Sequence, residues 1–225
     1  MANHLDLEEQ EQLDQIKHFW KQYGNAITWV LIAALGSFAS WNTYQYWQRN
    51  QAVQAAALFD EMDQAAKTDD VSRIERVFGD MKTGFGSTIY AHQSGLLTAQ
   101  KLVALGQYDS AKSALTWVAD HASDSNYQAL AKLRLTAVLI EEKNYDAALT
   151  ALNAKFPESL QPLVADRMGD VFFLQGKKDK AISEYQKAHR LMDSRMDYRR
   201  LIEVKLNALG VEVQTQSPLT TVSVK

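Results

Sequence analysis

The sequence predicts an all-α protein in which one membrane-crossing helix near the N-terminus precedes an array of antiparallel helix pairs. No charged residue occurs between positions 22 and 48. As a helix rising about 1.5 Å per residue, this stretch reaches roughly 40 Å, enough for a hydrocarbon core of about 30 Å. From residue 88 to residue 208, apolar residues recur at helical spacing between short breaks, without strand-like alternation. These observations define the fold class.

The predicted membrane helix occupies residues 24–47, after a short acidic segment over residues 1–23. Its densest apolar part, residues 26–39, is shorter than the roughly 20 residues that a span usually needs. Aromatic side chains gather at both ends of the helix, where amphipathic rings favour the lipid headgroups. The predicted interface anchors are Trp20, Tyr23, Trp41, Tyr44 and Trp47.

Two alternatives for this stretch are a cleaved signal peptide and a buried core helix. Ser37 and Ala39 offer the small residues of a cleavage site, but five acids would then stand in the segment that is normally basic. A buried core helix leaves the aromatic residues at both ends unexplained. The sequence therefore favours a membrane span.

Basic residues near the span predict its orientation. Lys17 and Lys21 precede it, whereas only Arg49 follows it before Lys67. The positive-inside rule then places the N-terminus in the cytoplasm and the C-terminal domain on the outer side.

The charge of the soluble domain is balanced. Residues 1–25 hold five of the 27 acids and two of the 24 bases, so that 22 of each remain beyond them. Such a near-neutral domain does not suggest nucleic-acid binding, and a chain without cysteine has no disulfide scaffold.

The soluble domain is predicted over residues 48–210, followed by a disordered tail over 211–225. No Gly or Pro occurs between Ser37 and Phe78, so the membrane helix can continue into the domain. Thr68 to Asp70 should end it, Val71 to Met81 should form the next helix, and Gly79 and residues 83–87 should form the next break. Further helices are expected at 88–105, 108–120, 126–142, 145–155, 161–175, 178–192 and 196–208.

Three junctions between these helices align with one another. They read GQYDSA at 106–111, KNYDAA at 143–148 and GKKDKA at 176–181. The closing alanines Ala111, Ala148 and Ala181 recur at intervals of 37 and 33 residues, which bracket the 34-residue period of tetratricopeptide repeats. The third unit resembles that pattern best, since Gly169 and Tyr185 stand at the expected spacings. We expect a right-handed, tetratricopeptide-like array, with a generic antiparallel helical array as the alternative.

The resemblance to tetratricopeptide repeats implies a concave groove lined by the first helix of each unit. Carrying over the groove positions of the family gives Leu96, Gln100, Val103, Leu133, Ala137, Ile140, Asp166, Asp170 and Phe173. This surface is mainly apolar and lacks a Lys/Arg cluster for a carboxylate terminus, so our hypothesis is a groove for apolar polypeptide segments. The alternative is that a neighbouring helix, such as 196–208, covers these residues as core.

No motif for catalysis or metal binding emerges. The five histidines are scattered without metal-ligand spacing, and the glycine-rich stretch at 83–87 lacks the Gly-Lys-Ser/Thr of a phosphate loop. Asp166 and Asp170 share a helix face, which we interpret as a solvated acidic face rather than an acid/base pair. We therefore expect a non-enzymatic protein without cofactor, catalytic residue or metal.

The chain as a whole resembles the YfgM family of Gram-negative bacteria. The resemblance rests on an acidic N-terminus, one uncleaved span and a tetratricopeptide-like domain, and on the runs Glu9–Leu13, Ile16–Trp20, Tyr23–Gly24 and Gln54–Phe59. It implies an inner-membrane protein with a periplasmic helical domain, an ancillary subunit of the SecYEG translocon. Further implied are association with the membrane-anchored chaperone PpiD and help in passing translocating polypeptides to periplasmic chaperones. The alternative is a structural scaffold for an envelope complex that binds no unfolded client.

Overall fold

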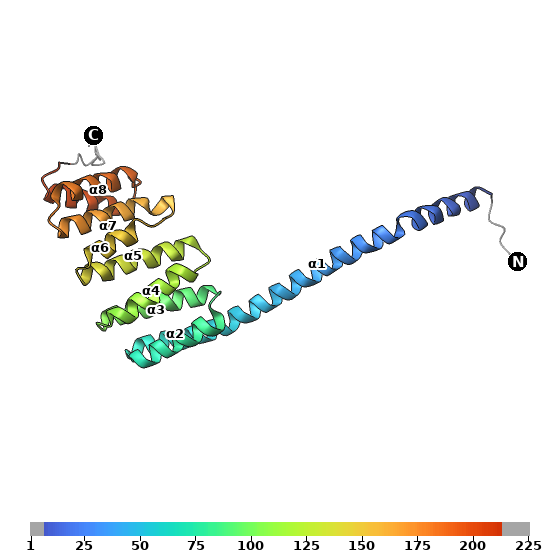
Figure 1. Ribbon diagram of the computed structural model, residues 1–225, viewed down its shortest axis with the longest axis horizontal. Coiled ribbons are helices and arrows are strands. Elements are labelled where there is room, and N and C mark those ends of the chain that lie inside the picture. Colours follow the sequence, from blue (N-terminus) through green and yellow to red (C-terminus); the bar gives the residue numbers. More distant parts are fainter. Residues whose placement is uncertain (1–6, 213–225) are drawn as a thin grey trace, which may run out of the picture. The chain divides into compact units, whose positions relative to one another are not determined.

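The computed structural model describes the backbone of residues 7–212 and the side chains of residues 11–212, and this part of the chain forms helices without a strand (Figure 1). The all-α prediction is thereby confirmed. Contacts divide the chain into two compact units that meet between Gln54 and Ala55. The helices are α1 (Leu7–Thr68), α2 (Val71–Phe85), α3 (Ile89–Ala104), α4 (Tyr108–His121), α5 (Ser125–Glu141), α6 (Tyr145–Leu152), α7 (Gln161–Leu174), α8 (Lys178–Leu191) and α9 (Tyr198–Ala208), with a 3₁₀ turn at Glu158–Leu160.

Helix α1 runs without a break through the predicted span, and within the described residues it alone is long and apolar enough to cross a membrane. Three hydroxyl groups there are satisfied within the helix: those of Thr28, Ser37 and Ser40 donate to backbone carbonyls four residues earlier, at 2.7–2.8 Å. Such bonds suit a hydrocarbon environment, where water cannot serve polar groups. The five predicted anchor side chains are exposed, and their role at the membrane interface stays a prediction.

The turn between α1 and α2 is built as predicted, but α2 is longer than expected. Asp69 adopts a positive φ of 52°, and the carboxylate of Asp70 caps the new helix by accepting from the backbone N–H of Arg73 at 3.1 Å. The prediction that Gly79 breaks the chain is wrong, because Gly79 and Gly84 lie inside α2. A helical glycine costs only about 1 kcal/mol, which is outweighed by the apolar face that α2 buries from Ile74 to Met81.

The three aligned junctions share one geometry. Gly106, Lys143 and Gly176 each adopt a left-handed backbone with φ of 74°, 59° and 73°. In each, the N–H of the next residue donates back across the turn to a carbonyl five residues earlier, at 2.8–2.9 Å, which satisfies the carbonyls at the helix end. The closing alanines Ala111, Ala148 and Ala181 are fully buried. The repeat alignment therefore describes real structural units, paired as α3–α4, α5–α6 and α7–α8.

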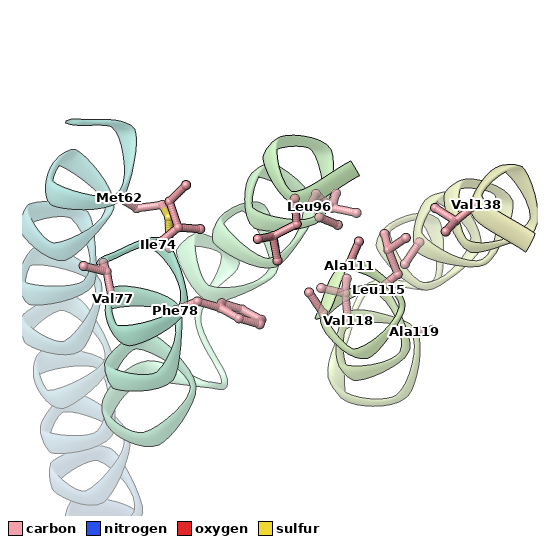
Figure 2. Packing of buried hydrophobic residues seen from close by; sticks show 14 of the residues in the cluster. Met62, Ile74, Val77, Phe78, Leu96, Ala111, Leu115, Val118, Ala119 and Val138 are labelled. Atoms are coloured by element: carbon pink, nitrogen blue, oxygen red, sulfur yellow. The ribbon is translucent and has the colours of Figure 1, made fainter. Parts of the chain in front are cut away.

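Three neighbouring clusters of side chains make up most of the core, each shared between consecutive helices. The first extends from the last turns of α1 to α5 and runs from Met62 through Phe78 and Leu115 to Val138 (Figure 2). The second joins α5, α6 and α7, and the third joins α7, α8 and α9. Each helix pair thus buries its apolar face only against its neighbours, as in a solenoid. The domain's first layer is the end of α1 packed on α2.

A buried histidine, His92, packs beside the first cluster. His92 is 2% exposed. The centroid of its ring lies 6.1 Å from that of Trp117 and 6.0 Å from that of Tyr127. Burial lowers the pKa of His92 below 6.5, although the backbone of Gly86 and of His121 acts in the opposite direction. The folded state therefore keeps this imidazole neutral at pH values where the unfolded chain protonates it.

Acidification is expected to destabilise the domain through His92. Below pH 6.5 the unfolded state binds a proton that the folded state resists, so the free energy of unfolding falls as the pH is lowered through this value. The variant His92→Phe keeps the aromatic packing and removes the titration. Urea denaturation at pH 7.5 and 5.5 should show a smaller loss of stability in the variant than in the original chain. An equal loss in both would contradict this assignment.

Candidate binding face of the helical array

A cavity of about 400 Å³ lies between α3, α4 and α5, a volume within the range of ligand-binding pockets. Three predicted groove residues line it, namely Gln100 and Val103 from α3 and Ala137 from α5. The spacing of three to four residues along each helix turns these side chains to one face. The complete lining consists of Ala99, Gln100, Val103, Tyr108, Leu115, Arg134, Ala137, Val138 and Glu141.

The cavity combines an apolar floor with a cationic side chain. Leu115 and Val138 belong to the first core cluster, so the floor is continuous with the interior. Arg134 is half-buried and donates from Nη1 to the backbone carbonyl of Leu96 at 3.2 Å. Its charge has no carboxylate partner among the residues that the structure describes. Such a setting can hold an apolar side chain and orient its polar neighbours.

The other groove positions of the first two units serve packing. Leu96 is buried at 6% exposure in the first cluster. Leu133 and Ile140 are half-buried and pack against the cluster that α5 shares with α6 and α7. Phe173, near the end of α7, is 53% exposed. The carried-over positions therefore divide into cavity-lining, packing and exposed side chains, and their part in binding stays a prediction.

In the third unit, helix α9 covers the acidic positions of α7. Asp166 is fully buried, and its carboxylate accepts from Lys205 Nζ at 2.8 and 2.9 Å and from the Tyr198 hydroxyl at 2.8 Å. Asp170 accepts from Lys205 at 2.6 Å and from the Tyr185 hydroxyl at 2.8 Å. The expected solvated acidic face is wrong, because these carboxylates need partners that α9 and α8 supply. This part of the predicted groove is closed.

The two tyrosines remain proton donors in this network. Burial, with the hydrogen bond to Asp166, raises the pKa of Tyr198 to about 12. Burial raises the pKa of Tyr185 as well, and the hydrogen bond to Asp170 adds to it. Both hydroxyls therefore keep their protons at any physiological pH and donate to the carboxylates. These hydrogen bonds and ion pairs connect α7 with α8 and α9.

The described part of the chain contains no group of three or more His, Asp or Glu side chains that could hold a metal ion. Of the nine residues that line the cavity, five are apolar and four are polar, namely Gln100, Tyr108, Arg134 and Glu141. Its side chains are suited to recognition by contact and charge. We therefore treat the cavity as a binding site.

Comparisons with known proteins place the chain in a family. The model of the tetratricopeptide repeat-like domain family matches residues 17–211. A protein of Neisseria gonorrhoeae is 34% identical over 93% of this chain and 100% of its own length. Proteins of Haemophilus influenzae and Escherichia coli are 26% and 25% identical over 90% of this chain and 98% and 97% of their own lengths. All three relatives are named ancillary SecYEG translocon subunit. The chain thus belongs to the YfgM family, the tetratricopeptide-like proteins known as ancillary SecYEG translocon subunits.

Proposed function

We propose that this protein is a single-pass inner-membrane subunit associated with the SecYEG translocon, which binds apolar segments of translocating polypeptides and helps to pass them to periplasmic chaperones. In this proposal residues 24–47 span the membrane, the N-terminus is cytoplasmic and the domain over residues 48–210 is periplasmic. The membrane-anchored chaperone PpiD is the proposed partner in the handover. The observation that carries the proposal is an open apolar cavity in a chain whose relatives, matched over nearly their full length, are named translocon subunits.

The cavity suits an unfolded client for a physical reason. A polypeptide that leaves a translocon has not yet buried its apolar side chains, and covering one such side chain is worth about 1.5–3 kcal/mol. The floor formed by Val103, Leu115 and Val138 can provide that cover. The affinity for the client stays modest because the flexible polypeptide loses conformational entropy when it binds. Modest affinity suits a subunit that must release its client.

Single-cysteine variants test this proposal, since the chain has no cysteine of its own. Ala137→Cys places a thiol in the cavity lining, and Thr150→Cys places one at an exposed position of α6 outside that lining. Gln15→Cys places one before the span. In intact spheroplasts, a membrane-impermeant maleimide should label positions 137 and 150. It should label position 15 only after permeabilisation. The reverse pattern would refute the periplasmic location and with it the proposed function.

The same variants report on the client. Each thiol is coupled to a photoreactive group and irradiated while a secreted polypeptide is being translocated. Position 137 should crosslink to the translocating chain, and position 150 should not. If position 137 captures one folded envelope protein and no translocating chain, the scaffold alternative is correct.

A further inference from the structure

Helix α5 presents two opposite charges to the cavity, and neither is neutralised. Arg134 and Glu141 both line it, and among the described residues neither has an ion-pair partner. The adjacent Glu142 shows the contrast, because Lys112 binds its carboxylate at 2.8 Å. A cation and an anion that flank one apolar surface form a charge pattern that a ligand can match.

The spacing of these charges defines the ligand's dimensions. Seven residues along a helix put the Cα atoms of Arg134 and Glu141 about 10 Å apart on one face, at 1.5 Å per residue. Ala137 lies between them along α5, and the floor residues Val103 and Val138 line the same cavity. In an extended polypeptide every second side chain points the same way, at about 3.3 Å per residue. Residues i and i+4 then lie about 13 Å apart, within reach of flexible charged side chains, and residue i+2 faces the floor.

Further polar groups in the lining suit an extended backbone. The amide of Gln100 and the hydroxyl of Tyr108 line the cavity, and neither has a hydrogen-bond partner among the described residues. An extended segment carries backbone N–H and C=O groups that need partners. The Gln100 amide can both donate and accept, and the Tyr108 hydroxyl can do the same.

We infer that the cavity between α3, α4 and α5 selects extended polypeptide segments in which an apolar residue is flanked, two positions away on either side, by one acidic and one basic residue. The acidic side chain pairs with Arg134, the basic side chain pairs with Glu141, and the apolar side chain covers the floor around Ala137. This inference rests on the proposed function, because it specifies which clients the same cavity takes. The client can bind in either chain direction, so the order of its acidic and basic residues does not matter. The cavity requires only that one flanking residue is acidic and the other basic.

Four fluorescein-labelled nonapeptides test the inference on the full-length chain in lipid nanodiscs. Their central pentads are Asp-Ser-Leu-Ser-Lys, Asp-Ser-Leu-Ser-Asp, Lys-Ser-Leu-Ser-Lys and Ser-Ser-Leu-Ser-Ser. Fluorescence anisotropy should give the mixed-charge peptide a dissociation constant about tenfold below those of the two like-charged peptides, because each partly exposed pair contributes a few-fold. The difference should shrink at 0.5 M salt, since exposed charges are screened.

Charge variants of the protein should redirect this preference. Glu141→Lys leaves two cations at the cavity and should favour the Asp-flanked peptide, while Arg134→Glu should favour the Lys-flanked peptide. Glu141 is exposed and has no ion-pair partner in the part of the chain that the structure describes, so its replacement is compatible with folding, and circular dichroism verifies this for both variants. Equal binding of all four peptides by every variant would overturn the charge inference and leave the groove function standing. If no peptide binds at any concentration tested, the proposed function itself fails.

Discussion

Replacement of Lys205 by methionine is expected to lower the free energy of unfolding of the domain by about 3–5 kcal/mol. The ammonium group of Lys205 lies 2.6–2.9 Å from carboxylate oxygens of Asp166 and Asp170, and Asp166 is fully buried. Without the cation, two carboxylates remain next to each other in a region from which water is largely excluded. Arg167 still pairs with Asp170 at 3.3 Å and the Tyr185 hydroxyl still donates to it. The fully buried Asp166 keeps only the neutral Tyr198 hydroxyl, which does not balance its negative charge.

Urea denaturation followed by circular dichroism at 222 nm measures this loss. The matched control is Lys187→Met, which removes a more exposed lysine paired with Glu184 at 3.8 Å and should change stability by less than about 0.5 kcal/mol. Adding Asp166→Asn to Lys205→Met should restore at least half of the loss, because a buried amide carries no charge. A Lys205→Met chain as stable as the Lys187→Met chain would show that the network contributes nothing.

This network also shows where prediction from the sequence reached its limit. Lys205 and Asp166 are 39 residues apart, and no local pattern connects them. A signal was nevertheless present. Ile202 and Leu206 on α9 and Leu209 directly after it form a buried apolar stripe, and Lys205 is adjacent to it. A lysine beside such a stripe can extend to water or pair with a carboxylate, and Asp166 and Asp170 were both candidates on the preceding first helix.

The helical array was predictable because its determinants are local. The three junctions repeat the same residue types, and each closes with the same backbone hydrogen bond. Gly79 misled the prediction because the free energy of packing along α2 depends on partners from other helices. The glycine position of the repeat was also shifted in the first unit. Ala99 occupies the aligned position, but the close contact occurs one turn earlier, where a Cβ on Gly95 would lie 2.4 Å from Val118.

The candidate site was predicted in part. The groove positions carried over from the tetratricopeptide family include Gln100, Val103 and Ala137, which line the cavity, and their part in binding stays a prediction. They did not include the lining residues Arg134 and Glu141. These two side chains lie three residues before and four residues after Ala137, so they share its helix face. Their importance depends on having no ion-pair partner among the described residues, which only tertiary structure reveals.

Replacing Gly169 with alanine is expected to destabilise the domain by about 1–3 kcal/mol, whereas the same replacement at Gly79 should stabilise it. A Cβ on Gly169 would lie 2.5 Å from two ring carbons of Tyr185. That ring is 3% exposed and its hydroxyl is held by Asp170, so it has little room to move. At Gly79 no heavy atom lies within 4 Å of the new Cβ, and alanine gains about 0.5–1 kcal/mol in a helix interior.

Urea denaturation of the two variants beside the original chain decides this prediction, because both substitutions add the same methyl group to a helical glycine. The opposite signs can therefore arise only from the space around each site. Combining Gly169→Ala with Tyr185→Leu removes the obstructing ring. In that background, Gly169→Ala should no longer lower the free energy of unfolding. If Gly169→Ala were as stable as Gly79→Ala, the close approach of α7 and α8 at this glycine would not be what selects it.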